Sequence, residues 1–125
     1  MLLICSLLGR EQMKQYIRIS RELGLSALVE AHSEEEVSMA ADAGAGIIGI
    51  NNRNLKTFEV DFSNALKLRR LVGPDTIFVA ESGIRTARDI EALAEAEVDA
   101  VLIGETLMRA PDRKAALAEL KRGCR

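Results

Sequence analysis

Short apolar runs recur along this chain at intervals of about 20 to 29 residues, and a segment with helical periodicity follows each run. Within a run the residues do not alternate between apolar and polar, so the expected strand is buried on both faces. Such strands are typical of parallel sheets that helices cover. The expected strands start near residues 2, 27, 47, 76 and 100. Five successive βα units therefore predict an α/β fold with a parallel sheet.

Capping signals mark the expected helices between these runs. Ser33 followed by Glu36 predicts a capping box at the start of the second helix. The third helix is expected over residues 61–71, and Thr86 is expected to cap the fourth. Pro111 is expected as the first residue of the last helix, since proline is well tolerated there.

Length and composition describe an ordinary globular protein. We expect the 125 residues to form a single domain, 1–125, with a core of its own. Hydrophobic residues make up 48% of the chain and aromatic residues 3%, so this core must be aliphatic. The net charge of −2 gives no electrostatic reason to expect nucleic acid or an anionic membrane as a partner.

The first expected strand, residues 2–8, is too short to span a bilayer and lacks the basic start of a signal peptide. Cys5, placed within that strand, is interpreted as a small core residue rather than a nucleophile. Together with Cys124 it makes neither a disulfide framework nor a metal-binding spacing. We therefore expect a reduced, cytoplasmic protein without a metal.

Two parent architectures fit five βα units. One is an open five-stranded sheet of the flavodoxin type, and the other is part of an eight-unit barrel. A closed barrel needs roughly 200 residues or more, so this chain cannot close one alone. In both architectures ligands bind at the carboxyl ends of the strands.

Polar residues follow all five expected strands. They are Cys5-Ser6, Glu30, Asn51-Asn52-Arg53, Glu81-Ser82-Gly83 and Gly104-Glu105-Thr106. Contributions from several strand ends are typical of barrel enzymes, in which the catalytic groups come from different strands. This edge of the sheet is therefore the candidate site.

Glu30 and Glu81 each follow a run of apolar strand, so each carboxylate should be partly desolvated. Desolvation and a nearby like charge would raise the carboxyl pKa toward the range suited to general acid–base chemistry. The alternative is that each carboxylate caps a helix or pairs with Arg53 or Arg85. From strand position alone, neither interpretation is preferred.

Glycines lie in two consecutive strand ends, Ser82-Gly83 and Gly104-Glu105. They would let backbone N–H groups approach an anion, and in barrel enzymes a phosphate is frequently bound by the loops after the last two strands. The alternative is that both glycines belong to ordinary turns between strand and loop.

The remaining polar candidates leave more than one interpretation open. Asn51 and Asn52 could hydrogen-bond a substrate hydroxyl or form Asx turns. Arg53 could bind a carboxylate, although a surface position is favoured for it. His32 is interpreted as a junction residue rather than a base, and Lys56 as a solvated side chain.

Four segments resemble the indole-3-glycerol-phosphate synthase family. They are Leu28–His32, Ile48–Leu55, Val79–Ile84 and Leu102–Met108, in the same order as in that family and with compatible spacing. The Asn-Asn-Arg-Asn-Leu stretch, followed by Thr57–Val60, is especially specific. The resemblance covers nearly the whole chain.

The resemblance implies an incomplete TIM-barrel-type fold, that is, five parallel βα units of a (βα)8 barrel. It also implies a carbon–carbon lyase of tryptophan biosynthesis that needs neither cofactor nor metal. That family converts 1-(2-carboxyphenylamino)-1-deoxyribulose 5-phosphate to indole-3-glycerol phosphate by ring closure, decarboxylation and dehydration. The partner implied is thus a small phosphorylated substrate.

Carried over motif by motif, the resemblance assigns a role to each strand end. Glu30 matches a catalytic acid–base carboxylate, while Asn51 and Glu81 match catalytic residues that contact the substrate. Arg53 and Ser82 are implied to bind substrate. The implied phosphate-binding residues are Ser82, Gly83, Gly104 and Glu105. The family often has serine in place of Glu105, and a backbone donor tolerates that change.

One departure from the family is large. Residues 2–8 resemble barrel strand four, and no lysine here matches the family's catalytic lysines on earlier strands. We therefore expect little or no turnover from this chain alone, and self-association through the open edges of the half-barrel.

Two alternatives are a half-barrel fragment for folding or assembly without a catalytic task, and a flavodoxin-like binding module. A flavodoxin-like receiver domain, the binding module considered, requires acidic residues at the positions of Cys5-Ser6 and Asn51 and a lysine at the position of Gly104.

Overall fold

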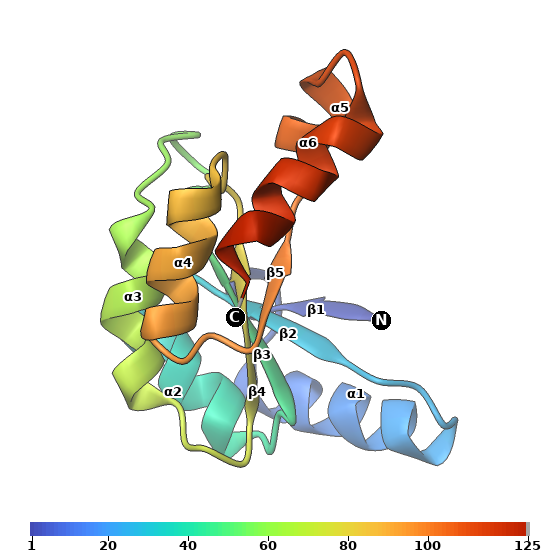
Figure 1. Cartoon of the computed structure of the whole chain (residues 1–125). Helices are drawn as coiled ribbons and strands as arrows, with labels where there is room; N and C mark the ends of the chain where they lie inside the picture. Colours follow the sequence, from blue (N-terminus) through green and yellow to red (C-terminus); the bar gives the residue numbers. More distant parts are fainter. Residues whose placement is uncertain (125) are drawn as a thin grey trace.

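A computed structural model describes residues 1–124 of the chain. Its five strands form one fully parallel sheet in the order β1-β2-β3-β4-β5 (Figure 1). The strands are β1 (Leu2–Ile4), β2 (Leu28–Ala31), β3 (Ile47–Asn51), β4 (Ile77–Glu81) and β5 (Ala100–Leu102). A flavodoxin-type sheet has the order 2-1-3-4-5, so the strand order excludes that alternative and agrees with part of a (βα)8 barrel.

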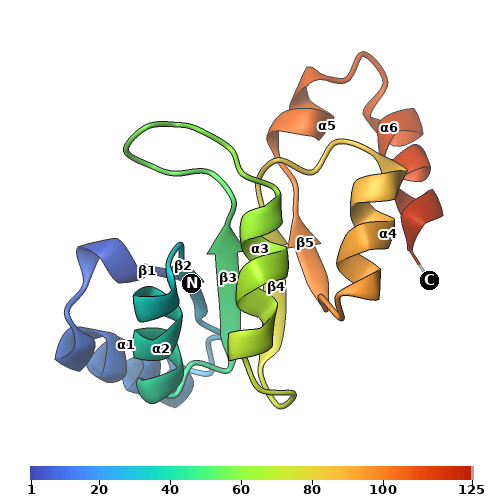
Figure 2. The same cartoon turned by 90° about the vertical axis from the view of Figure 1, so that its left-hand side faces the viewer.

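Helices connect the strands and cover one face of the sheet. The α-helices are α1 (Arg10–Glu22), α2 (Glu34–Asp42), α3 (Ser63–Leu68), α4 (Ala87–Glu95), α5 (Glu105–Arg109) and α6 (Arg113–Leu120). Three short 3-10 helices are η1 (Cys5–Leu7), η2 (Arg69–Leu71) and η3 (Lys121–Gly123). Helices α2, α3 and α4 lie side by side on the same face (Figures 1 and 2). This follows from right-handed crossovers between strands that are consecutive in the sheet.

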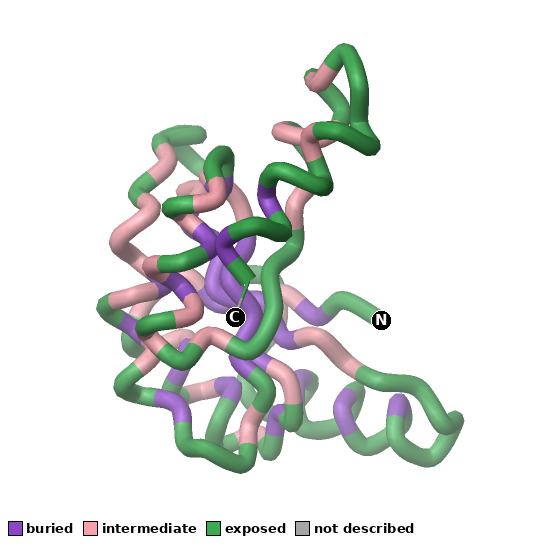
Figure 3. The backbone as a smooth tube through the Cα atoms, in the orientation of Figure 1, coloured by how far each residue is buried: buried purple, intermediate pink, exposed green. Residues whose placement is uncertain are grey.

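The core lies between the sheet and these helices. Val29, Ile48 and Phe78 are register partners on three neighbouring strands, and all three are fully buried. Val37 of α2 and Leu93 of α4 are buried in the same cluster. Burial of each such side chain is worth about 1.5–3 kcal/mol. Figure 3 shows this buried centre of the sheet and the exposed helical segment that follows β5.

The other face of the sheet is open among the described residues. Leu2, Ile77 and Leu102 alternate with the core residues and are 49%, 48% and 48% exposed. Strands β1 and β5 are each paired on one side only. Parallel sheets are normally covered on both faces, so this apolar face and these two edges are unusual surfaces.

Three sequence predictions require correction at the chain's ends. The first strand ends at Ile4 instead of residue 8, because the chain turns into the 3-10 helix η1. Cys5 is consequently not in a strand, although it is buried, and burial raises the pKa of its thiol to about 12. Pro111 is not the first residue of the last helix, since the Asp112 carboxylate accepts from the Ala115 N–H and caps α6.

The other predicted caps are present with one difference. Thr86 and Asp89 form a reciprocal capping box at the start of α4. Ser33 caps α2 by accepting from the N–H of Glu36. The Glu36 carboxylate accepts from the N–H of His32 at 2.7 Å instead of the N–H of Ser33, so the predicted capping box is not complete. No helix in residues 1–124 is long and apolar enough to cross a membrane.

Candidate active site at the carboxyl ends of the strands

Three polar side chains from neighbouring strands meet on the open face of the sheet. Glu30 lies near the end of β2, while Asn51 and Glu81 are the last residues of β3 and β4. Asn51 and Glu81 are register partners, and Glu30 is the partner of Gly49, two residues before Asn51. Since residues two apart on a strand share a face, the register brings the three together, and all three are buried.

The Glu81 carboxyl lies directly over Gly49 of the neighbouring strand. A Cβ atom added to Gly49 would lie 1.9 Å from Glu81 Oε1. That oxygen is buried and has no hydrogen-bond partner among the described residues. Burial, followed by the charge of Glu30, raises the pKa of Glu81 from 4.5 to about 7. Glu81 can therefore both donate and accept a proton near neutral pH.

Hydrogen bonds on three sides fix Asn51. Its Nδ2 donates to Glu30 Oε1 at 3.2 Å, and its Oδ1 accepts from the N–H of Arg53 at 2.9 Å in an Asx turn. Its carbonyl oxygen lies 2.7 Å from His32 Nδ1. A carbonyl oxygen can only accept, so this nitrogen of His32 carries the proton. His32 thus links the ends of β2 and β3, which agrees with its interpretation as a junction residue.

Ser82 and Gly83 form a sharp turn after β4. Both residues have positive φ, +66° and +74°, which is uncommon for a residue other than glycine. The Ser82 carbonyl oxygen accepts from Asn52 Nδ2 at 3.0 Å, which holds the turn in place. On the far side, Thr106 Oγ1 donates to the carbonyl oxygen of Ile84 at 2.6 Å. This bond ties the start of α5 to the loop after β4.

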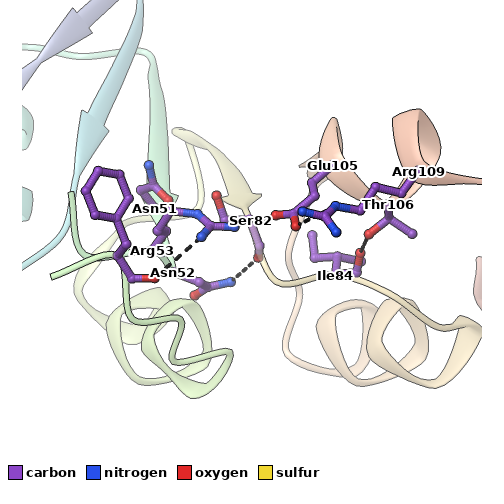
Figure 4. A network of polar contacts seen from close by, with 9 residues as sticks. Asn51, Asn52, Arg53, Ser82, Ile84, Glu105, Thr106 and Arg109 are labelled. Carbon is purple, nitrogen blue, oxygen red and sulfur yellow. Dashed lines mark hydrogen bonds and ion pairs between the residues drawn. The ribbon is translucent and has the colours of Figure 1, made fainter.

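The loops that follow β3, β4 and β5 border one cleft of about 800 Å³. Its lining includes Arg53, Ser82, Gly83, Gly104, Glu105 and Arg109. All the residues expected to bind phosphate therefore line one cleft, together with Arg53. Figure 4 shows Arg53, Glu105 and Arg109 directed toward one another across it.

Arg53 is more enclosed than the sequence suggested. Its side chain is 28% exposed, and its Nη2 lies 2.5 Å from Glu105 Oε2. Its Nη1 donates to the carbonyl oxygen of Phe58 at 3.4 Å. Arg53 is thus partly exposed, and its guanidinium group crosses from the β3 loop to α5 and forms part of the cleft wall.

A family profile described as "Indole-3-glycerol phosphate synthase" matches residues 1–120 of this chain. The chain belongs to the indole-3-glycerol-phosphate synthase family. The synthase of Ruminiclostridium cellulolyticum is 60% identical over 120 residues, and that of Endomicrobium trichonymphae is 55% identical over the same length. Each match covers 96% of this chain but 46% of the relative. The chain thus spans about half the length of the curated relatives it matches, and it matches their C-terminal part.

Solved structures show the same fold. The 3-hexulose-6-phosphate synthase of Salmonella typhimurium superposes with a TM-score of 0.80 at 12% identity, over 98% of this chain and 59% of that one. Thiamine phosphate pyrophosphorylase of Pyrococcus furiosus gives a TM-score of 0.74 at 20% identity, over 97% of this chain and 56% of that one. These likenesses establish the architecture, an incomplete (βα)8 barrel, and nothing about the chemistry.

A smaller cavity of about 180 Å³ lies toward the β1 side of the candidate site. Glu30, Asn51 and Arg53 line it together with Lys56. The lysine is exposed, as expected, and its backbone N–H donates to Asn54 Oδ1 at 2.8 Å. Within residues 1–124, no group of three or more His, Cys, Asp and Glu side chains is arranged to hold a metal ion.

The sequence did not identify Gly49 as part of the candidate site, and neither role predicted for Asn52 agrees with its contacts. Gly49 provides the space that the Glu81 carboxyl fills, and a glycine inside a strand is a known sign of close approach. Asn52 is fully buried, and its Oδ1 accepts from the N–H of Ala65 at 2.9 Å at the start of α3. Asn52 therefore positions Ser82 and α3, and it is not available to a substrate hydroxyl.

Proposed function

We propose that this chain carries the substrate-binding half of an indole-3-glycerol-phosphate synthase site. The substrate would be 1-(2-carboxyphenylamino)-1-deoxyribulose 5-phosphate, converted to indole-3-glycerol phosphate with loss of carbon dioxide and water. This is a carbon–carbon lyase reaction of tryptophan biosynthesis. The single observation that carries the proposal is the buried carboxylate pair beside a cleft with two glycine-containing strand ends.

The carboxylate pair suits the proton transfers of this reaction. Ring closure forms a hydroxyl group from a carbonyl, and dehydration then removes that hydroxyl with a proton. Glu81, with a pKa of about 7, can hold a proton at neutral pH beside the Glu30 carboxylate. Asn51 donates to Glu30 and borders the same face, so it would orient Glu30 and contact the substrate.

The cleft suits the phosphate. Backbone N–H groups of Ser82, Gly83, Gly104 and Glu105 would serve as donors, because the Glu105 side chain itself repels an anion. Arg53 adds a guanidinium group, which can bind phosphate or carboxylate oxygens through two hydrogen bonds. The short link from Thr106 to Ile84 keeps the two glycine-containing loops adjacent.

Calorimetry can test the proposed binding. The substrate should bind the chain saturably, and inorganic phosphate should compete for the same site. Glucose 6-phosphate, which carries a phosphate but no carboxyphenylamino group, should bind more weakly than the substrate. No measurable substrate binding, or binding that phosphate does not affect, would contradict the proposal.

Catalytic turnover by this chain is a separate question from substrate binding. We propose that the chain alone is nearly inactive, because no lysine in it matches the family's catalytic lysines. Loss of a proton donor typically lowers the rate by about 10²–10⁴-fold, and loss of substrate positioning adds to this. A fluorescence assay for indole-3-glycerol phosphate should therefore show only a trace of product. Turnover close to that of a full-length relative would refute the proposal.

We further propose that the chain self-associates through its open surfaces. Leu2, Ile77 and Leu102 are half-exposed on the uncovered face, and β1 and β5 have unpaired edges. A second copy could cover this apolar surface and pair its strand edges. Sedimentation should show dimers or larger species at micromolar concentration, whereas a stable monomer over that range would count against the proposal.

The proposed compartment is the cytoplasm. Cys5 and Cys124 are both free thiols in the structure. Unpaired thiols are characteristic of proteins kept in a reducing environment. Fractionation of the source cells followed by detection of the chain would test this, and recovery with the membrane or secreted fraction would contradict it.

A further inference from the structure

The Glu105 carboxylate is held between two guanidinium groups inside the cleft. Its Oε2 lies 2.5 Å from Arg53 Nη2, and its Oε1 lies 3.1 Å from Arg109 Nε. Figure 4 shows the three side chains in one network beside Ser82. Both oxygens of the carboxylate thus bind cations that line the region assigned to a phosphate.

The two ion pairs differ in character. Glu105 and Arg109 are four residues apart on the short helix α5, and the Arg109 side chain is 81% exposed. Arg53 belongs to the loop after β3, and its side chain is 28% exposed. The carboxylate can therefore turn away from Arg53 and remain on its own helix next to Arg109. This movement breaks the bond between the two loops and frees the more enclosed guanidinium group.

A phosphate group is the better partner for that guanidinium. It carries close to two negative charges at neutral pH and three acceptor oxygens, whereas a carboxylate carries one charge and two oxygens. Arg53 would therefore exchange Glu105 for a phosphate when one enters the cleft. A monoanionic carboxylate ligand gains less from the exchange and should displace Glu105 poorly.

We propose that Glu105 is an internal competitor for the phosphate site, which holds Arg53 until a phosphate-bearing ligand displaces it. The inference rests on the proposed phosphate site and adds a residue that limits affinity and favours dianionic ligands. Glu105 is thus a specificity-determining residue rather than a catalytic one.

The test uses the whole chain titrated with inorganic phosphate, followed through the amide NMR signals of Gly83 and Gly104. Removing the carboxylate with Glu105→Gln should tighten binding by about threefold to tenfold, as expected for loss of a partly exposed competing ion pair. Glu119→Gln is the matched control, because it also removes one carboxylate charge, here from an exposed ion pair between Glu119 of α6 and Arg122 of η3. The control should leave phosphate affinity nearly unchanged.

A double-mutant cycle separates competition from simple charge repulsion. In an Arg53→Gln background, Glu105→Gln should improve binding much less, because only charge repulsion is relieved and there is no guanidinium group left to release. An equal improvement in both backgrounds would overturn the inference, since repulsion does not depend on Arg53. Unshifted signals of the buried Met13 would show that each variant is folded, and Glu105→Ser provides a second variant for the same cycle.

The outcomes also separate this inference from the proposed function. If phosphate shifts Gly83 and Gly104 in the native chain and Glu105→Gln binds with equal affinity, the competitor role fails and the phosphate site stands. If phosphate shifts neither glycine in any variant, the phosphate site fails and the competitor role fails with it.

Discussion

At the scale of single residues, the burial of Glu81 raises the pKa of its carboxyl and makes the stability of the fold depend on pH. Its carboxyl is buried over Gly49 beside Glu30, and its pKa is raised from 4.5 to about 7. The folded chain therefore binds this proton more tightly than the unfolded chain does. The resulting stabilisation is complete below pH 4.5 and is lost as pH rises through about 7.

The variant Glu81→Gln should remove this pH dependence, because an amide does not ionise. Urea unfolding should show the native chain losing stability between pH 5 and pH 8, while the variant loses less. At pH 8 the variant should be more stable by about 1–2 kcal/mol, a range reduced for solvent at the open face. Glu119→Gln, which alters an exposed ion pair, should keep the native pH profile. An unchanged profile in Glu81→Gln would contradict the assignment.

The variant Gly49→Ala should displace the Glu81 carboxyl, since the new Cβ would lie 1.9 Å from Oε1. Once moved toward solvent, the carboxyl should titrate closer to its ordinary pKa of 4.5. Carboxyl ¹³C NMR of Glu81 against pH measures this directly. Gly46→Ala is the control, because a Cβ at Gly46 meets no atom within 4 Å. A Glu81 pKa that stays near 7 in Gly49→Ala would show that burial over Gly49 is not its cause.

The sequence predicted the polar residues at the strand ends better than the residues that hold those side chains in position. The burial of Glu30 and Glu81 could be predicted, because each residue follows a run of apolar strand. Gly49 could not, because its role depends on which side chain of the next strand leans over it. The supporting role of Asn52 could not be predicted for a similar reason: its partners, Ser82 and Ala65, lie 30 and 13 residues away along the chain.

At the scale of elements, the end of the chain returns to pack against α4. Gly123 of η3 is buried, and a Cβ there would lie 2.0 Å from the carbonyl oxygen of Ala87. Leu120 of α6 is also buried in the core cluster. The absence of a side chain at Gly123 therefore permits the last helical segment to dock on the start of α4.

The variant Gly123→Ala should disturb this docking and destabilise the fold by about 1–3 kcal/mol, the usual range for overpacking. Urea unfolding measures the loss. Gly73→Ala provides the comparison, since a Cβ at Gly73 meets nothing within 4 Å, and its effect should be within about 0.5 kcal/mol. Equal stability of the two variants would show that the docking contributes little.

The boundaries of helices and strands were predictable where the sequence has a clear apolar run or a clear capping residue. The apolar runs predicted β3 and β4 closely, and Thr86 predicted the start of α4. The first strand was predicted too long, because an apolar run does not reveal where extended backbone turns into a 3-10 helix. Helix α5 was missed, since its five residues are too short for a helical period to stand out.

At the scale of the whole molecule, the uncovered face of the sheet is the surface through which we propose that the chain self-associates. The proposed self-association predicts that Ile77→Lys places a charge on the contact surface and shifts the monomer–oligomer equilibrium toward monomer by about tenfold or more. Sedimentation velocity over a concentration series measures this shift. Gln15→Lys, which adds the same charge among Glu11, Lys14 and Arg18 on α1, should leave the equilibrium unchanged. Equal effects of both substitutions would contradict association through this face.

Periodicity alone left the whole-molecule architecture open, whereas the family resemblance predicted part of a (βα)8 barrel, which the structure confirms. Five βα units follow from the periodicity of the sequence, but both parent folds contain such units. The sheet order β1-β2-β3-β4-β5 decides between them, and this order depends on pairing between segments far apart in the chain. Hydrophobic periodicity carries no information about that pairing, which only the resemblance to a known family predicted.

The central claim is that the strand ends form one site for a phosphorylated substrate. The most direct measurement is an amide NMR titration of the chain with 1-(2-carboxyphenylamino)-1-deoxyribulose 5-phosphate and, separately, with the same compound lacking its phosphate. We predict saturable shifts at Gly83 and Gly104 together with Asn51 and Glu81, and affinity weaker by about tenfold or more without the phosphate. Shifts confined to other parts of the chain, or equal affinity for the two compounds, would contradict the claim.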